Sequence, residues 1–193
     1  MKLYRAVARQ HYEEGKIIRR NPGRRLPSNI PYLVDNLLEF ARPSDKPSRR
    51  HSVYASPTPQ LALQYAVAGG ADRAAYLVCE LRCKAPPAIM QLTSQDAKLH
   101  TDVLHLQQFV NDRVRDMSMS SIEDKLNLAP LCLPGVLKEE LLAAMEKSPF
   151  LHSLVTDAAE TVTFWNPAPQ DVSPDGELFF ELTDGNYFTQ HPV

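Results

Sequence analysis

The sequence predicts an α+β fold, in which strands and helices occupy separate regions of the chain rather than alternating regularly. Strand-like segments lie near both ends, at residues 2–8 and 177–182. The stretch from 94 to 148 instead carries apolar residues at helical spacing. Glycine is scarce, with seven in 193 residues, and neither a Gly-x-Gly-x-x-Gly nor a Walker-type string occurs. A doubly wound nucleotide-binding fold therefore has little support.

The first fifty residues predict one strand, one helix and two loops. Residues 2–8 alternate in polarity, as a strand does. Prolines and a glycine between 22 and 31 exclude regular structure there. Apolar residues at helical spacing in 32–40 then predict a short amphipathic helix that ends before Pro43. Residues 43–50 are polar and basic, so we expect a loop.

A strand followed directly by a helix is predicted next. Residues 52–55 favour a strand. Thr58 has the side chain of a helix N-cap, and Pro59 stands at the first helical position, where its missing N–H costs nothing. This helix should extend to about Ala68 and stop at Gly69–Gly70.

The remainder of the chain is expected to be helical between strands. In order, the predicted elements are a strand at 74–83, helices over 94–129 and 134–148, a helical turn from 152 followed by a strand at 161–165, a proline-rich loop at 167–174, and a last strand at 177–182. We therefore expect one domain over 1–193 with a helical insertion at about 94–150.

Charge is unevenly distributed along the chain. Residues 1–50 hold twelve lysines and arginines against five acidic residues, whereas the rest holds nine against eighteen. A basic N-terminal part is compatible with a polyphosphate or nucleic-acid partner, through the loops at 19–25 and 42–50. The same pattern is produced by an ordinary solvated basic surface, and aromatic residues for base stacking are not interleaved with these arginines.

Composition limits the class of protein further. No apolar run approaches the ~20 residues that span a bilayer, and no signal-peptide core is visible near Met1. We expect a cytoplasmic protein, or an effector secreted without such a leader, and no membrane partner. Cys79, Cys83 and Cys132 are too few for a disulfide framework and lack further metal ligands at suitable spacing, so we expect buried thiols and no metal.

Three short motifs carry the candidate chemistry. The first strand contains Arg5, in Leu-Tyr-Arg-Ala-Val. The strand-to-helix segment contains Tyr54 and Ser56, in Val-Tyr-Ala-Ser, and continues to Tyr65. A late segment, Asp175-Gly-Glu177-Leu-Phe-Phe, places two acidic side chains ahead of an apolar strand.

In these motifs and their order the chain resembles the ADP-ribosyltransferase superfamily. The eleven-residue spacing of Tyr54 and Tyr65 is similar to the polymerase and diphtheria-toxin branch. Arg5, Ser56 and the pair Asp175 and Glu177 resemble the branch with an Arg–Ser–Glu set. The Leu-Tyr-Arg and Val-Tyr-Ala-Ser strings also resemble RES-domain toxins, which degrade NAD. The likeness covers about seventy N-terminal residues and fifteen near the C-terminus.

The resemblance implies a fold, a substrate and a role for each residue. The fold would be a split β-sheet core, and NAD would be the substrate. Arg5 would bind its phosphate or ribose oxygens, Tyr54, Ser56 and Tyr65 would line the nicotinamide pocket, and Glu177 would be the catalytic carboxylate. Asp175 would help to orient an acceptor.

The expected activity is transfer of ADP-ribose to a macromolecule, with protein a better candidate than nucleic acid, in a bacterial toxin or effector. Two alternatives stay open beside nucleic-acid binding. Water as acceptor would make the protein an NAD glycohydrolase. A binding module without turnover is the other, because Ala6 replaces the family's glycine and Ala62 stands where the polymerase branch has a serine. Glu181 competes with Glu177 for the carboxylate role.

Overall fold

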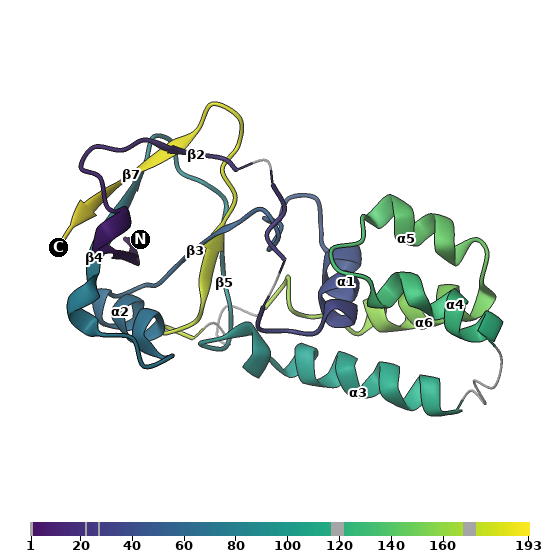
Figure 1. Ribbon diagram of the computed structural model, residues 1–193. Helices are drawn as coiled ribbons and strands as arrows, with labels where there is room; N and C mark the ends of the chain where they lie inside the picture. The colour runs from purple at the N-terminus through teal and green to yellow at the C-terminus, as the bar shows by residue number, and fades with distance from the viewer. Residues whose placement is uncertain (1, 22, 27, 117–121, 168–172) are drawn as a thin grey trace. The chain divides into compact units, whose positions relative to one another are not determined.

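The protein has an α+β fold that divides into two compact units (Figure 1). The computed structural model describes residues 2–21, 23–26, 28–116, 122–167 and 173–193. The sheet unit comprises residues 1–23, 45–96 and 168–193, and the helical unit comprises 24–44 and 97–167. Each unit draws on distant parts of the chain, so neither corresponds to one continuous segment.

The sheet unit contains two antiparallel sheets. The four-stranded sheet has the order β1-β4-β7-β2, and the three-stranded sheet has the order β3-β6-β5. Their bounds are β1 Leu3–Ala8, β2 Ile18–Arg19, β3 Val53–Ala55, β4 Tyr76–Cys83, β5 Ile89–Gln91, β6 Leu178–Phe180 and β7 Tyr187–Pro192. The strands predicted at 2–8, 52–55, 74–83 and 177–182 are confirmed, the last in shorter form, whereas β2, β5 and β7 were not predicted.

Helix α2 (Pro59–Val67) begins as its sequence predicts. The Thr58 hydroxyl accepts a hydrogen bond from the Leu61 N–H at 3.3 Å, with Pro59 at the start of the helix. The helix packs against β1 and β4. Gly70 follows it with a φ of +84°, a left-handed conformation that glycine adopts without steric cost.

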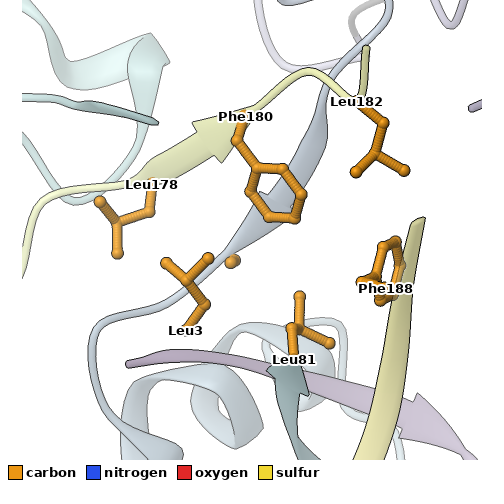
Figure 2. Close-up of a cluster of buried hydrophobic side chains, with 7 residues drawn as sticks. Leu3, Leu81, Leu178, Phe180, Leu182 and Phe188 are labelled. Carbon is orange, nitrogen blue, oxygen red and sulfur yellow. The ribbon is translucent and has the colours of Figure 1, made fainter. Parts of the chain in front are cut away.

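One hydrophobic cluster lies between the two sheets (Figure 2). The four-stranded sheet contributes Leu3, Leu81 and Phe188, and the three-stranded sheet contributes Ala55, Leu178 and Phe180, with Leu182 beyond its end. Side chains alternate across a strand, so the residues between these positions project from the other face of each sheet. That alternation decides where the candidate site residues point.

The helical unit is built around helix α1 (Tyr32–Ala41), which contacts α3, α4, α5 and α6. Val34, Leu37 and Leu38 of α1 are fully buried, as its apolar spacing predicts. The surrounding helices are α3 Thr101–Asp116, α4 Ile122–Cys132, α5 Lys138–Met145 and α6 Pro149–Glu160. Three 3₁₀ turns complete the described elements of the chain, at Arg9–His11, Arg73–Ala75 and Ala97–Leu99.

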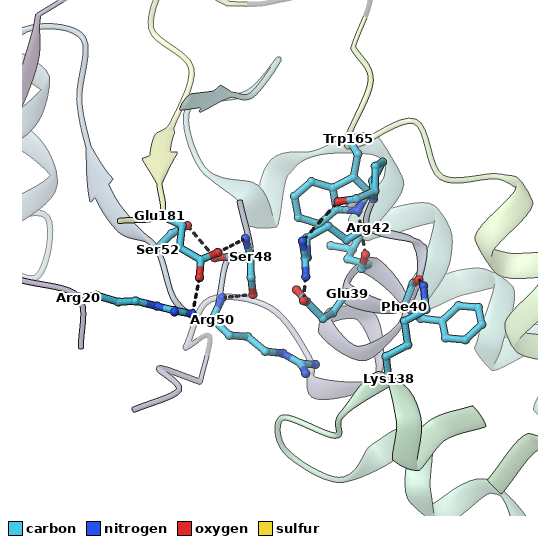
Figure 3. A network of polar contacts seen from close by, with 12 residues as sticks. Arg20, Glu39, Phe40, Arg42, Ser48, Arg50, Ser52, Lys138, Trp165 and Glu181 are labelled. Atoms are coloured by element: carbon cyan, nitrogen blue, oxygen red, sulfur yellow. Dashed lines mark hydrogen bonds and ion pairs between the residues drawn. The ribbon is translucent and has the colours of Figure 1, made fainter. Parts of the chain in front are cut away.

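The strand predicted at 161–165 is wrong. These residues form turns after α6, because the carboxylate of Asp102 accepts hydrogen bonds from the backbone N–H groups of Thr163 and Phe164, both at 2.6 Å. The indole N–H of Trp165 donates to the Leu38 carbonyl at 2.8 Å (Figure 3). The backbone donors are thus satisfied without a partner strand, and the aromatic residues are buried among helices. The proline-rich loop predicted at 167–174 falls largely outside the described residues.

Candidate functional site

The site is centred on Glu177, the residue immediately before β6. The Glu177 carbonyl accepts from the Leu92 N–H at 3.0 Å, and the Glu177 N–H donates to the Ser94 carbonyl at 2.9 Å. These two bonds extend the pairing of β5 with β6 beyond their ends, so the backbone of Glu177 is fixed. Its side chain is 14% exposed, so a small part of it is accessible to a ligand.

Gly176 permits the close approach of this segment to β5. A Cβ atom at position 176 would lie 2.0 Å from the carbonyl oxygen of Leu92. Because that oxygen belongs to the backbone, a side chain would push the Glu177 segment away from its neighbour. Glycine is therefore required beside the candidate carboxylate for a packing reason.

The strand register brings Ser56 close to both Glu177 and the first strand. Ser56 and Tyr4 exchange two backbone hydrogen bonds, at 2.7 and 2.9 Å, which join β3 to β1. On its other side, β3 pairs with β6 so that Ala55 lies opposite Leu178. The next position in this antiparallel register sets Ser56 opposite Glu177. Ser56 is buried.

Arg5 projects on the side of the four-stranded sheet that carries the hydrophobic cluster. It pairs with Cys79 in the register of β1 and β4, two positions from the pair of Leu3 with Leu81. Side chains two residues apart share a face, so Arg5 shares the face of Leu3 and is half-buried there. The structure thus brings the backbone of Arg5 near Ser56 but directs the arginine toward the cluster side.

Tyr54 projects from the opposite face of the three-stranded sheet, with Glu177 and Phe179. The Tyr54 and Phe179 ring centres are 5.8 Å apart. The buried guanidinium carbon of Arg49 lies 5.7 Å from each ring centre, and Arg49 Nη1 lies 4.0 Å from Glu177 Oε2. Two aromatic rings, one cation and one carboxylate are therefore gathered on this face.

Tyr65 of α2 belongs to the same electrostatic neighbourhood. Its hydroxyl donates to the Gln95 carbonyl at 2.9 Å. Partial burial raises the pKa of Tyr65 above 10.0, and the negative charges of Glu177, Asp96 and Asp175 raise it further, because they disfavour a phenolate. The residue is 37% exposed, so an edge or face of the ring is available to a ligand.

Hydrogen bonds fix the turn at residues 48–52, which includes Arg49; Figure 3 shows those made by Ser48, Arg50, Ser52 and Glu181. The Ser52 hydroxyl donates to the Ser48 carbonyl at 2.6 Å, and the Arg50 N–H donates to the Ser48 hydroxyl at 3.3 Å. Glu181 accepts from the Ser48 N–H at 3.1 Å and from the Arg20 guanidinium at 2.8 Å. Both oxygens of the Glu181 carboxylate are thus occupied by contacts to Arg20 and to this turn.

Arg49 is the site residue that the sequence interpretation missed. Residues 43–50 are uniformly polar, which predicts a solvated loop, yet Ser48, Arg49 and Arg50 are all 3% exposed or less. The burial depends on Glu181, which is 133 residues away from Ser48 along the chain. No pattern within residues 43–50 therefore indicates that these residues are buried.

The structure does not favour nucleic-acid binding by the two basic loops. Arg49 and Arg50 are buried, Arg20 pairs with Glu181, and Arg42 pairs with Glu39 at 2.8 Å. These guanidinium groups are engaged within the protein rather than aligned on a surface for phosphates.

The remaining candidates for a functional site lie elsewhere or are weak. A hollow of about 240 Å³ is lined by His105, Gln108, Phe109, Asp112 and Arg113 of α3, and contains none of the residues predicted from the sequence. In the described ranges, no three or more His, Cys, Asp or Glu side chains are grouped to hold a metal ion. No helix in those ranges has the length and apolar character that crossing a membrane requires.

The cysteines form no site of their own. Cys79 is buried and Cys83 is half-buried, and burial raises the pKa of both thiols. Cys132, expected to be buried, is instead exposed as the last residue of α4, next to the fully buried Leu131.

Comparison of the chain with protein-family models, with curated proteins and with solved structures finds no match.

Proposed function

We propose that the protein binds NAD beside Glu177 and cleaves its nicotinamide–ribose bond, passing ADP-ribose to a macromolecular acceptor. The observation that carries this proposal is the grouping of Tyr54, Tyr65, Asp175 and Glu177 around one end of the three-stranded sheet. These residues come from segments more than a hundred positions apart, and each was selected from the sequence for the same reaction.

The chemistry requires a carboxylate near the ribose. When the bond between ribose C1′ and the nicotinamide nitrogen breaks, its electron pair leaves with neutral nicotinamide, and positive charge develops on the ribose. A fixed carboxylate such as Glu177 stabilises that charge. An acceptor nucleophile then bonds to C1′ and loses its proton, and Asp175 is suited to orient that nucleophile.

The aromatic side chains suit the leaving group. Nicotinamide in NAD is flat and cationic, and an aromatic face attracts such a ring by ~0.5–2 kcal/mol. Tyr65 presents exposed ring surface near Glu177, whereas the Tyr54 ring is already in contact with Arg49. We therefore assign the principal nicotinamide contact to Tyr65 and a lining role to Tyr54.

Two features of the fold also support an ADP-ribosyltransferase-like core. The two sheets meet at the Tyr4–Ser56 bridge, as expected of a split sheet. The candidate glutamate precedes a strand that pairs with the strand bearing Tyr54. Ser56 serves in this proposal through its place between Tyr4 and Glu177, whereas Arg5 projects on the cluster side of β1, away from Tyr54 and Glu177, and is given no contact with NAD.

The test is nicotinamide release from NAD, measured with transfer of labelled ADP-ribose to proteins of a cell lysate. We expect release by the native protein and a loss of about 100-fold or more in Glu177→Gln. The matched control is Asp184→Asn, because Asp184 is 98% exposed and lies after β6, the strand that Glu177 precedes. The Asp184→Asn protein should release nicotinamide at the native rate.

The outcomes separate the alternatives. Nicotinamide release without labelled protein identifies a glycohydrolase, in which water replaces the acceptor. No release by the correctly folded native protein rejects both enzymatic versions and leaves the binding module. Equal activity in Glu177→Gln and the native protein rejects Glu177 as the catalytic carboxylate.

A further inference from the structure

The surroundings of Arg49 are unusual for an arginine. Its side chain is 2% exposed, although transfer of a guanidinium from water to a protein interior is costly unless charge and hydrogen-bonding groups compensate. The guanidinium carbon lies 5.7 Å from the ring centres of Tyr54 and of Phe179, beside both rings, and Arg49 Nη1 lies 4.0 Å from Glu177 Oε2, an ion-pair contact without a hydrogen bond. The compensating groups therefore include the candidate catalytic residue itself.

The backbone around Arg49 is fixed on both sides. Glu181 binds the Ser48 N–H, and the Tyr54 hydroxyl donates to the Arg49 carbonyl at 3.1 Å. The first anchor, Glu181, directly follows β6, and the second, Tyr54, lies in β3, which pairs with β6. The turn that carries Arg49 is thus tied to β3 and to the segment after β6, and Glu177 immediately precedes β6.

We propose that Arg49 is the positioning residue of Glu177: its guanidinium, packed beside the rings of Tyr54 and Phe179, attracts one carboxylate oxygen so that the other faces the ribose of the bound dinucleotide. This inference rests on the proposed function. Arg49 is too deeply buried to contact the ligand itself, so it acts through Glu177.

The geometry requires arginine rather than any cation. A guanidinium is planar, so it packs beside aromatic rings while presenting N–H groups at its edge, and it stays charged when buried. A lysine ammonium at the same place would keep the charge but would lack the planar contact with the rings. Arg49→Lys keeps the positive charge but loses the planar group, and Arg49→Gln loses the charge. Together the two variants distinguish the contribution of the charge from that of the planar shape.

The experiment measures kcat and KM for nicotinamide release in the native protein, Arg49→Lys and Arg49→Gln, scaled to the folded fraction from circular dichroism. We expect kcat to fall about 10- to 100-fold in both variants, because a small misplacement of a reacting group is costly. KM should change less than about threefold, since Arg49 does not contact NAD. Arg50→Lys is the matched control, because Arg50 is equally buried in the same turn; its kcat should be retained.

A thermal double-mutant cycle tests the pair without NAD. The Tm losses of Arg49→Gln and Glu177→Gln should be non-additive, with the double variant more stable than their sum by about 2 °C or more. Additive Tm losses in the cycle overturn the inference. A native kcat in Arg49→Gln also overturns it, as does a fall in the kcat of Arg50→Lys equal to that of the Arg49 variants. Coupled losses in a native protein that releases no nicotinamide reject the proposed function while upholding the ion pair that orients Glu177.

Discussion

Glu177 and Glu181 lie four residues apart on either side of β6, and their surroundings assign them different tasks. The Glu181 carboxylate binds Arg20 and the Ser48 N–H, so both of its oxygens are engaged in holding a turn. Glu177 lies instead beside Arg49 and close enough to Tyr65 to raise the pKa of that tyrosine. The sequence left the choice between the two open, and their contacts favour Glu177 as the reactive carboxylate.

The pKa of Tyr65 provides a test of this neighbourhood at the scale of one residue. Burial is the largest cause of its rise above 10.0, followed by the charge of Glu177. Glu177→Gln removes a negative charge that opposes ionisation, so the Tyr65 pKa should fall toward 10.0. The measurement is a pH titration of tyrosine ring signals by NMR, with Tyr65→Phe to assign the signal.

Glu13→Gln is the control for this titration, because Glu13 is exposed and is not among the causes of the Tyr65 shift. It should leave the Tyr65 pKa unchanged. A Tyr65 pKa that is the same in Glu177→Gln and the native protein would place the two side chains outside each other's electrostatic reach.

The elements show where local sequence decides structure and where it does not. β1, α1, β3, α2 and β4 follow from patterns within each segment, such as the Thr58 cap of α2. The strand predicted at 161–165 fails because Asp102, some sixty residues earlier, binds its backbone donors. β7 was missed because only one of its two buried positions, Phe188, is apolar: Gln190 is polar yet buried, and the strand ends in proline.

Gly176 tests the pairing that fixes Glu177 at the scale of an element. Gly176→Ala would bring a methyl group against the Leu92 carbonyl, and relief requires movement of the segment before β6. We expect a loss of about 1–3 kcal/mol in the free energy of unfolding, together with reduced nicotinamide release. Urea denaturation measures the first effect.

Gly69→Ala is the matched substitution, since nothing lies within 4 Å of a Cβ at position 69 and the residue has no positive φ. This substitution should leave the free energy of unfolding unchanged or raise it slightly, because alanine gives the unfolded chain fewer conformations than glycine does. Equal stability of the two variants would mean that the backbone beside Glu177 is not closely packed.

At the scale of the molecule, long-range pairing forms the site. The sequence predicted the α+β class, which the fold confirms, and short motifs proposed Arg5, Tyr54, Ser56, Tyr65, Asp175 and Glu177 as site residues, which stay a prediction. It could not predict the division into a sheet unit and a helical unit, whose segments alternate along the chain. Nor could it predict the burial of Arg49, whose turn is held by Glu181, more than a hundred residues later in the chain.

The most direct test of the account is a crystal structure of the Glu177→Gln protein with NAD, in which turnover is prevented. The account predicts the nicotinamide ring against Tyr65 and the adjoining ribose within hydrogen-bond distance of the side chain at position 177. NAD bound away from both residues, or no NAD bound at saturating concentration, would contradict it.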